Sequence, residues 1–446
     1  MDFLKLVNKY EDDLVKDLVK LLQIDTVAIE QPEVVEAPFG ENLKNALEHV
    51  LALGESFGFK TKNIDNIAGH IEYGEGEEIV AVLSHIDVVP AGDGWKYPPF
   101  SGTIEGDKIY ARGALDDKGP LMSSIYALKM IADSGVKLNK RIRLIFGTDE
   151  ESGSRGVKRY LKVEEKPTMG FSPDANFPLI YGEKGIMSIN ISTTKPENSF
   201  KFSSGTRHNL VPEVASLKTN NDLAKAFNEY CEKNKFKGKV EGNNYTLYGK
   251  SSHAMEPEKG INALVNLASF LKEHTDNELI KFIANNLTDT RFNAINENFT
   301  DKEMGDLTVN VAIANINEKG GNLILNLRYP INWDKEKFLN NFKSLGKEYH
   351  LNVEVINDSV PHYVDPNSEL VKTLHNAYIK YTNDTTSKLQ TIGGGTYARE
   401  LGNAVAFGML MPGREDVVHR VDEFIYISDL LTSTAIFAEA IYQLGK

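Results

Sequence analysis

The first part of the chain carries two hydrophobic patterns that alternate, one typical of helices and the other of buried strands. Apolar residues recur every three or four positions at 43–53 and at 121–131, which predicts two helices that pack against a core. The continuous apolar runs at 78–83 and 141–146 predict two buried strands. Because strands and helices alternate here, we expect an α/β fold with a mixed, mostly parallel sheet flanked by helices.

The pattern changes in the middle of the chain. Residues 186–192 alternate between apolar and polar side chains, as a half-exposed strand does, and residues 240–250 and 306–316 look similar. Helical stretches at 221–233 and 261–274 separate these strands. This middle part therefore has an α+β composition.

Helix and strand patterns of the first kind return near the C-terminus. We predict a helix at 369–381, a strand at 404–409 and a terminal helix at 428–444, with Ser428 as its N-cap. The last part would then rejoin the first domain and make the middle part an insertion.

The expected limits follow from these changes of pattern. Residues 1–186 and 363–446 form the two parts of one domain, and residues 187–362 form the inserted α+β domain.

Composition describes an ordinary globular protein. The chain has 446 residues, of which 41% are hydrophobic and 25% charged. No apolar run approaches the roughly 20 residues that a membrane span needs. The start, residues 1–22, mixes acidic residues with apolar residues at helical spacing and has no signal-peptide pattern. We therefore expect a cytoplasmic protein with no membrane partner.

Cysteine and charge narrow the chemistry further. Cys231 is the only cysteine, so a disulfide within the chain and a thiolate metal cluster are both excluded. Any metal must be bound by histidines and carboxylates. The formal net charge of -13 argues against nucleic acid as a partner, because nucleic acid requires basic surfaces.

Five short segments are rich in metal-ligand side chains, and each follows a predicted strand or turn. In α/β sheets, functional groups gather beyond the carboxyl ends of the strands. Two imidazoles and several carboxylates are the ligand set that a pair of Zn²⁺ or Mn²⁺ ions accepts. The segments are 84–87, 114–119, 148–152, 172–175 and 418–423.

Each segment alone has a plain structural interpretation. His85 and Asp87 lie two apart, which places them on one face of a strand, as a ligand and its orienting carboxylate or as incidental polar residues of a turn. Asp116 and Asp117 open a predicted helix, where a carboxylate bridges two cations or caps the helix.

The remaining segments are equally open when taken singly. Glu150 and Glu151 are adjacent, so one could bind a metal while the other takes a proton from water, or both belong to an exposed acidic turn. Asp174 and His419 alone are more typical of structural residues than of a site. The five segments together change this balance.

Taken in order, the segments resemble the zinc-dependent aminoacylase/carboxypeptidase family of dinuclear metallopeptidases, and most of all its PepV-type bacterial dipeptidases. The resemblance extends from residue 84 to residue 424. The matching phrases are SHIDVVPAGDGW (84–95), YARGALDDKGP (110–120), GTDEESGS (147–154), SPDANFP (172–178), YGKSSHAMEPEKGINA (248–263), NLRYP (326–330), IGGGTYARE (392–400) and MPGREDVVHRVDEF (411–424).

The resemblance implies a set of ligands for two divalent ions, Zn²⁺ or Mn²⁺. Asp116 would bridge both ions. His85 and Asp174 would complete one ion, and Glu151 and His419 the other.

The resemblance also implies roles beside the metals. Glu150 would be the general acid/base, and Asp87 would support His85. Asp117 would follow a cis peptide bond.

The inserted domain resembles the lid of this family, and the rest its catalytic domain. His253 would reach the substrate oxygen, and Asn209 and Arg328 would bind substrate together with Gly393, Gly394 and Gly395. Arg207-His208 departs from the family pattern just before Asn209. The alternative for Arg328 is an ordinary charge on a strand surface.

The function implied is a metal-dependent dipeptidase that hydrolyses dipeptides with a free N-terminus, using water shared by two metals and Glu150 as the base. The nearest alternative is an aminoacylase or N-acyl amino acid deacylase of the same family. A non-catalytic metal-binding protein is the remaining alternative. The size of the region 187–362 favours a monomer, since PepV-type enzymes combine a large lid with a monomeric state.

Overall fold

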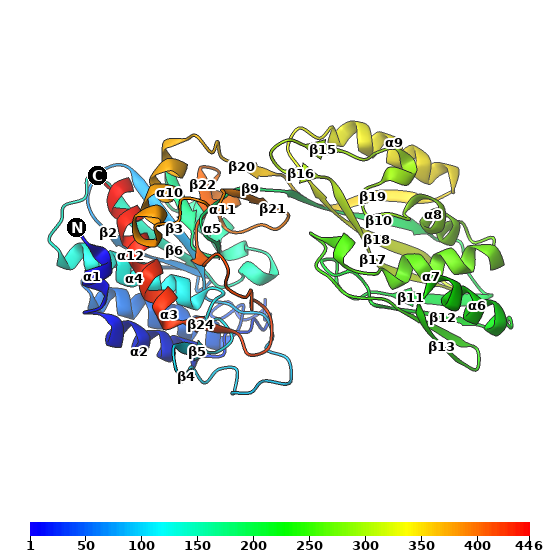
Figure 1. The fold of residues 1–446 in the computed structure, drawn as a ribbon, viewed down its shortest axis with the longest axis horizontal. Helices are drawn as coiled ribbons and strands as arrows, with labels where there is room; N and C mark the ends of the chain where they lie inside the picture. Colours follow the sequence, from blue (N-terminus) through cyan, green and yellow to red (C-terminus); the bar gives the residue numbers. More distant parts are fainter. The chain divides into compact units, whose positions relative to one another are not determined.

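The computed structural model describes residues 1–446, which divide into two compact units. The first unit consists of Met1–Tyr181, Tyr363–Gln390 and Gly395–Lys446, and the second of Gly182–His362 and Thr391–Gly394 (Figure 1). The sequence patterns did not single out Thr391–Gly394, which pack with the second unit although they lie far along the chain from it.

A nine-stranded mixed sheet forms the centre of the first unit. Its strands are β1 (Lys60–Ile64), β2 (Ala68–Tyr73), β3 (Ile79–His85), β6 (Arg141–Gly147), β7 (Met169–Ser172), β9 (Ile180–Glu183), β20 (His362–Tyr363), β21 (Gln390–Ile392) and β22 (Ala404–Ala406). The order is β1-β2-β6-β3-β7-β22-β9-β20, and β21 pairs with β9. Neighbours are parallel from β6 to β22, whereas β1, β2 and β9 pair antiparallel. The predicted α/β class with a mixed sheet is confirmed, and its parallel part is the centre.

Helices cover both faces of this sheet because the side chains of each strand alternate between two cores. Val80 and Val82 of β3 belong to the larger core, and Ala81 and Leu83 belong to the smaller one. In the larger core, α4 packs along α12 (Figure 1). The helices of this unit are α1 (Phe3–Val7), α2 (Glu11–Leu22), α3 (Glu41–Ser56), α4 (Lys118–Asp133), α5 (Arg155–Val163), α10 (Glu369–Thr382), α11 (Ala398–Leu401) and α12 (Ile427–Leu444).

Two small sheets complete the first unit. One joins β4 (Thr103–Glu105), β5 (Lys108–Tyr110) and β24 (Phe424–Tyr426), and the other pairs β8 (Ala175–Asn176) with β23 (Met409–Leu410). The first of these brings the segment after His419 beside the segment before Asp116.

An eight-stranded sheet with helices on one face makes up most of the second unit (Figure 1). The strand order is β13 (Lys237–Glu241), β14 (Asn244–Tyr248), β12 (Val214–Thr219), β11 (Phe200–Ser204), β17 (Thr308–Asn317), β18 (Gly320–Tyr329), β10 (Gly185–Thr193) and β19 (Asn352–Ser359). The helices are α6 (Ala224–Asn234), α7 (Ala263–Leu271), α8 (Glu278–Asn286) and α9 (Lys335–Glu348), and β15 (Thr300–Asp301) pairs with β16 (Gly305–Asp306). Successive residues of β18 alternate, so that Leu323, Leu325 and Leu327 enter the helix-covered core.

The helical spacing at the N-terminus corresponds to two helices, because the chain turns at residues 8–10 between α1 and α2. Two local predictions need correction. The predicted strand at 240–250 contains a hairpin turn between β13 and β14. Ser428 is the second residue of α12 and not its N-cap, and Asp107 accepts hydrogen bonds from its backbone N and its Oγ at 3.1 and 2.5 Å.

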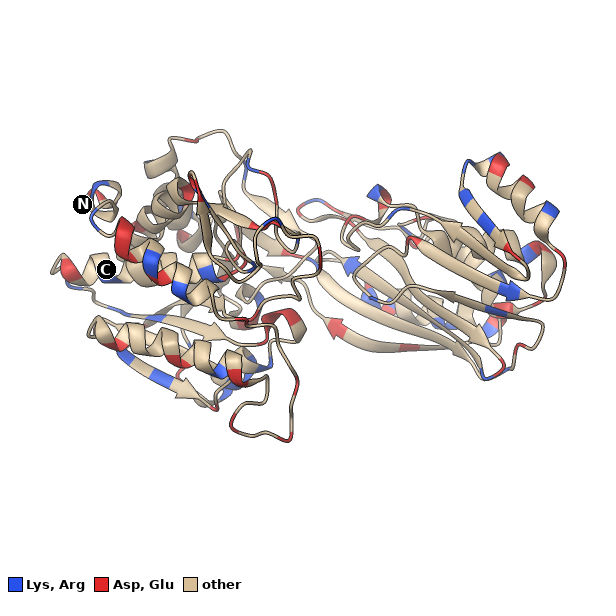
Figure 2. Ribbon diagram, turned by 90° about the horizontal axis from the view of Figure 1, so that it is seen from below, with Lys and Arg blue, Asp and Glu red and all other residues tan.

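Charge is mixed over both units. Figure 2 shows Lys and Arg interspersed with Asp and Glu along the helices and strands of each unit. No helix in the structure combines the length and the apolar character needed to cross a bilayer.

Candidate metal centre

Three parallel strands end side by side, and each leads into one of the ligand-rich segments. The register pairs His85, the last residue of β3, with Gly147, the last residue of β6. On the other side of β3, Val82 pairs with Phe171 of β7, and Asp174 follows two residues after that strand ends. The parallel register therefore brings the segments at 84–87, 148–152 and 172–175 to one edge of the sheet.

Two groups of side chains at this edge have the spacing of metal ligands, and they share Asp116. His85, Asp116 and Asp174 form one group, and Asp116, Glu151 and His419 form the other, with the potential ligand atoms of each group within 4.8 Å of one another. His85 Nε2 lies 3.0 Å from Asp116 Oδ1 and 3.5 Å from Asp174 Oδ2. His419 Nε2 lies 2.9 Å from both Asp116 Oδ2 and Glu151 Oε1.

The two oxygens of Asp116 therefore face different imidazoles. Oδ1 belongs to the His85 group and Oδ2 to the His419 group. This is the arrangement that a bridging carboxylate requires.

Asp117 stands at the N-cap position of α4, yet its side chain does not cap the helix. Its Oδ2 accepts a hydrogen bond from the backbone N of His85 at 2.9 Å, so this carboxylate fixes the end of β3. The Asp116–Asp117 peptide bond is cis, as the resemblance implied.

Asp87 supports the site differently from the sequence-based expectation. We expected its carboxylate to orient His85, but its backbone oxygen is the closer partner of His85 Nδ1, at 2.9 Å, whereas Oδ1 is 3.5 Å away. The two carboxylate oxygens instead accept hydrogen bonds from the backbone N of Glu150 and of Glu151, each at 3.0 Å. Asp87 thus orients His85 through its main chain and the glutamate turn through its side chain.

The glutamate turn is fixed from both ends. Gly147 ends β6, and the ring of Tyr397 packs so closely over it that a Cβ atom at this position would overlap the tyrosine hydroxyl. After the turn, Asp149 accepts hydrogen bonds from the backbone N of Arg155 and of Gly156 at 2.9 and 2.7 Å, which anchors the start of α5. The side chains of the adjacent residues Glu150 and Glu151 are thereby held in defined directions.

Sequence reasoning missed Glu423 and Arg112, which form a buried ion pair behind Asp116. Arg112 Nη1 donates to Glu423 Oε2 at 2.6 Å, and both residues are at most 1% exposed. Burial raises the pKa of Glu423 to about 7, Asp116 adds to the rise, and Arg112 opposes it. Arg112 lies in the phrase YARGALDDKGP and Glu423 in MPGREDVVHRVDEF. Their closeness in sequence to Asp116 and His419 was the one signal that could have indicated a role at the site.

Tyr397 was also missed, although it lies within the phrase IGGGTYARE. Its ring meets the His85 ring edge to face at 6.2 Å between centroids, and it is 1% exposed. Its hydroxyl is buried without a hydrogen-bond partner. An aromatic residue next to a glycine run gives no such signal by itself.

The carboxylates of the two groups raise the pKa values of the two imidazoles. Burial alone would lower the pKa of His85, but Asp116, Asp174 and Asp87 raise it well above its usual range. Burial also opposes protonation of His419, and Asp116 and Glu151 nevertheless raise its pKa to about 11. A cluster that binds protons this strongly has an excess of buried negative charge.

Glu150 lies within this anionic cluster without joining either ligand group. Burial raises the pKa of Glu150 well above its usual range, and the carboxylates of Glu151 and Asp174 raise it further against the opposing effect of His85. A carboxylate in such surroundings accepts a proton more readily than one in water.

The donor set fits divalent cations. Ligand atoms bound tetrahedrally to one Zn²⁺ at about 2.0–2.2 Å lie roughly 3.3–3.6 Å apart, and the imidazole–carboxylate separations of 2.9–3.5 Å are close to this range. Imidazole and carboxylate are ligands that Zn²⁺ and Mn²⁺ accept. Bound cations would also offset the excess negative charge of these buried carboxylates.

The predicted substrate-binding residues gather within the second unit, apart from Gly395, which belongs to the first. Asn209 and His253 lie on adjacent segments, since the backbone N of Ala254 donates to Asn209 O at 2.9 Å and Leu210 pairs with His253. Both side chains are exposed.

Arg328 is the buried member of this set, at 4% exposure. Its Nε donates to Asn326 Oδ1 at 2.9 Å and its Nη1 to Gly393 O at 2.8 Å. Gly393 packs against Met255, two residues after His253, and a side chain at position 393 would overlap Met255. Their roles toward a substrate stay a prediction.

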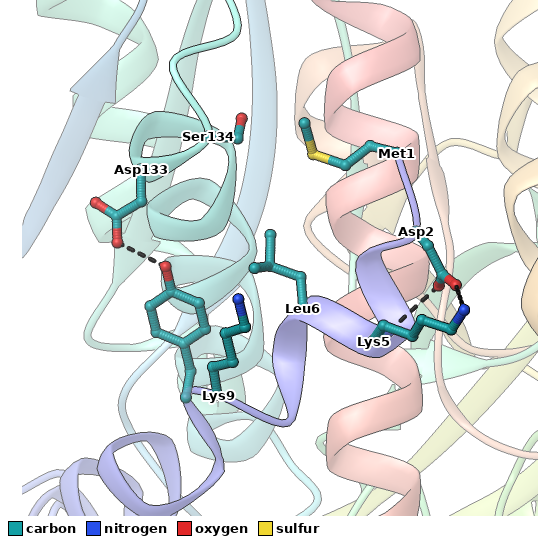
Figure 3. A pocket seen from close by; sticks show the side chains of 8 residues that line it. Met1, Asp2, Lys5, Leu6, Lys9, Asp133 and Ser134 are labelled. Atoms are coloured by element: carbon teal, nitrogen blue, oxygen red, sulfur yellow. Dashed lines mark hydrogen bonds and ion pairs between the residues drawn. The ribbon is translucent and has the colours of Figure 1, made fainter.

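A surface pocket of about 370 Å³ lies between α1 and the end of α4 and contains none of the candidate residues (Figure 3). Tyr10 donates a hydrogen bond to Asp133 Oδ2 there at 2.7 Å, and burial raises the pKa of Tyr10 to about 12. Two lysines, two apolar side chains, Asp2 and Ser134 line the rest, and none of them belongs to a candidate metal-ligand group.

Comparison with known families agrees with this geometry. Residues 81–443 match the family described as Peptidase family M20/M25/M40. The chain belongs to this family. It is therefore a peptidase, and the resemblance to a metallopeptidase family is confirmed.

Relatives of this peptidase extend over its whole length. A Bacillus subtilis (strain 168) protein named "Putative dipeptidase YtjP" is 42% identical over 461 aligned residues, which cover 99% of each chain. A Staphylococcus epidermidis (strain ATCC 12228 / FDA PCI 1200) protein named "Putative dipeptidase" is 39% identical and covers 98% of each. Among solved structures, human carnosine dipeptidase 1 has a TM-score of 0.62 at 14% identity, covering 99% of this chain and 98% of that chain. At this identity the likeness shows a shared fold.

Proposed function

We propose that this peptidase is a dipeptidase that hydrolyses dipeptides with a free N-terminus, using two divalent cations. One observation carries the proposal: two imidazole–carboxylate groups share Asp116, and Glu150 lies beside them without belonging to either. The relatives named as dipeptidases, 42% and 39% identical over nearly the full length, support the choice of substrate.

His85, Asp116 and Asp174 would bind one cation, and Asp116, Glu151 and His419 the other. Zn²⁺ and Mn²⁺ both suit these ligands. When bound, such a pair of cations acidifies water and polarises the carbonyl of the scissile peptide bond. Asp87 would orient the protein groups on both sides, through its backbone oxygen to His85 and its carboxylate to the glutamate turn.

Glu150 would act as the general base and then as the general acid. Its backbone N donates a hydrogen bond to Asp87, which fixes the main chain that carries the carboxylate. Burial raises the pKa of this carboxylate and makes it a better proton acceptor. Glu150 would take a proton from the attacking water and deliver it to the leaving amino group. Glu151, fixed by the same turn, would remain a ligand.

Arg328, with the backbone of Gly393–Gly395, would bind the carboxylate of the substrate. A buried guanidinium offers several N–H donors in a fixed plane, which suits a carboxylate. His253 would stabilise the oxyanion and Asn209 would contact the substrate. Asp174 and the nearby carboxylates would attract the ammonium group of the substrate, and recognition of both ends would limit its length to two residues.

The decisive variant is Glu150→Gln, assayed for dipeptide hydrolysis with its metal content measured in parallel. We expect metal content to stay at the wild-type value and turnover to fall at least about 100-fold, because general-base catalysis contributes about that much or more. Glu165→Gln is the matched control, since Glu165 is a 63% exposed acid of the same unit. Turnover of Glu150→Gln close to that of this control would eliminate Glu150 as the base.

A second assay separates the dipeptidase from an N-acyl amino acid deacylase. The wild-type protein would be given a dipeptide and the same dipeptide with an acetylated amino group. We expect the unblocked dipeptide to have the higher kcat/KM. Preference for the acetylated substrate would contradict the proposal. If both reactions continue after chelation without added Zn²⁺ or Mn²⁺, the metal mechanism is contradicted.

A further inference from the structure

The His419 side chain is poorly packed, although Val417 and Val418 before it contact the larger core of the first unit. The side chain is 49% exposed. The turn at His419 contains two residues with a left-handed backbone conformation, His419 with φ +62° and Asp422 with φ +58°. Left-handed conformations cost free energy in residues other than glycine, so they persist only where other contacts determine them. Something other than burial must therefore fix the imidazole relative to Asp116 and Glu151.

Glu423 ends this turn, and its side chain is completely buried. Its Oε1 accepts hydrogen bonds from the backbone N of Leu115 at 2.9 Å and of Asp116 at 3.2 Å. Its backbone oxygen accepts a third hydrogen bond from the backbone N of Ala111 at 3.1 Å. One residue thus joins the end of the His419 turn to the main chain of the bridging aspartate.

Arg112 supplies the opposite charge for Glu423. Its Nη1 donates to Glu423 Oε2 at 2.6 Å, and its guanidinium lies 5.2 Å from the centre of the Trp95 ring. A buried carboxylate that has a charged partner and backbone donors keeps a fixed orientation, because losing any partner leaves a buried charge unsatisfied. The two oxygens of Glu423 therefore serve two separate purposes, one toward Arg112 and one toward the ligand segment.

We propose that Glu423 is a positioning residue that sets His419 against Asp116, and with it the geometry of the Asp116–Glu151–His419 cation site. The inference rests on the proposed metal-dependent function and goes beyond it, because Glu423 belongs to neither of the two ligand groups. The carboxylate fixes the backbone of Asp116 on one side and the end of the His419 turn on the other. Residues that orient ligands in this way typically change metal affinity 10–100-fold when replaced.

The same unit contains a buried pair with no such connection, which makes a matched control. Arg143 Nε donates to Glu72 Oε2 at 2.9 Å, and both residues are at most 7% exposed. This pair joins β2 to β6 and contacts no candidate ligand. A purely structural role for Glu423 would make its variants behave like variants of Glu72.

The test measures how firmly Zn²⁺ is bound. Full-length protein loaded with Zn²⁺ is dialysed against increasing concentrations of a chelator, at a temperature below the melting temperature of the protein. The zinc that remains bound is measured by elemental mass spectrometry. The variants are Glu423→Gln, which keeps an oxygen acceptor, Glu423→Leu, which removes it, and Glu72→Gln as the control. Melting temperatures are recorded for all of them.

We expect Glu423→Gln to lose one of two zinc ions at about 10-fold lower chelator concentration, and Glu423→Leu at up to about 100-fold lower concentration. Glu72→Gln should melt at a lower temperature and retain zinc as the wild type does.

If Glu423→Leu does not fold, Glu423→Gln alone decides the question. Wild-type zinc retention in Glu423→Gln, or an equal loss in Glu72→Gln, overturns the inference. Wild-type protein that binds neither Zn²⁺ nor Mn²⁺ would instead overturn the proposed function.

Discussion

At the scale of single residues, the site depends on carboxylates whose two oxygens have different partners. Asp116 presents one oxygen to each imidazole, and Asp87 presents one oxygen to the backbone of each glutamate. Each arrangement fixes two other groups relative to one another. Asn326 and Gly393 act similarly on Arg328, since they accept hydrogen bonds from different nitrogens of its guanidinium.

Replacing Arg328 by alanine tests its proposed contact with the substrate carboxylate. A hydrogen bond between charged groups contributes about 1.5–3 kcal/mol, so KM for a dipeptide should rise roughly 10- to 100-fold with a smaller change in kcat. The control substrate is the same dipeptide with an amidated C-terminus, for which the variant and the wild type should differ little. An equal effect on both substrates would show that Arg328 does not bind the carboxylate.

At the scale of secondary-structure elements, a buried polar chain connects β2, β6 and α5. Arg143 of β6 pairs with Glu72 of β2 and also donates to the hydroxyl of Tyr160 at 3.1 Å. That hydroxyl lies 2.7 Å from Nδ1 of His70, so Nδ1 of neutral His70 can accept a hydrogen bond from it. Burial lowers the pKa of His70 to about 3, and the charge of Arg143 contributes to the same direction.

The contribution of His70 to stability should therefore fall as pH decreases below the ordinary histidine pKa. The unfolded chain binds a proton at His70 near pH 6.5, whereas the folded chain does not until about pH 3. Stability contributed by neutral His70 is complete above pH 6.5 and is lost between pH 6.5 and 3. From pH 7.5 to 5.5 the loss amounts to about 1.4 kcal/mol.

Urea unfolding of the wild type and of His70→Gln at these two pH values measures the effect. Glutamine keeps an acceptor for Tyr160 but does not titrate. The wild type should lose about 1.4 kcal/mol more than the variant does on acidification. Parallel changes in the two proteins would mean that His70 is protonated in the folded state.

At the scale of the whole molecule, the chain has a separate hydrophobic core in each of its two units. Phe437 lies in the first core against Phe171, Phe177 and Phe407, and Phe342 lies in the second against Phe282, Phe292 and Phe338. Every candidate metal ligand belongs to the first unit. Metal binding should therefore depend on one core only.

Phe437→Ala and Phe342→Ala form a matched pair for this prediction. Each should cost about 3–5 kcal/mol of stability, the usual cost of truncating a buried phenylalanine. Melting experiments with and without Zn²⁺ would show whether the metal protects each variant. We expect Phe342→Ala to retain its zinc at temperatures where only the second unit has unfolded. Loss of zinc together with the second core would contradict this assignment.

The sequence predicted the elements with strong periodicity and the segments that carry ligands. The strands at 78–83 and 141–146 and the helices at 43–53 and 121–131 correspond to β3, β6, α3 and α4, because continuous or periodic apolar runs specify them. The segments at 84–87, 148–152 and 172–175 converge because three parallel strands end at one edge, and the pairing of β5 with β24 brings the segments of Asp116 and His419 together. The partner of each atom was not predictable, since residues far apart in sequence provide it.

Asp87 and Glu423 illustrate that limit. The spacing of His85 and Asp87 correctly placed them together, but only the register of β3 and β6 shows that the Asp87 carboxylate bonds to the glutamate turn. Glu423 lies 307 and 308 residues from the backbone groups that it contacts. No local pattern specifies a contact over such a separation.

The account as a whole claims that Asp116 lies between two cations. Anomalous diffraction from crystals of the protein grown with Zn²⁺, recorded at the zinc absorption edge, measures this directly. We predict two peaks, one among His85, Asp116 and Asp174 and one among Asp116, Glu151 and His419. Absence of a peak from both groups, or zinc bound only elsewhere in the protein, would contradict it.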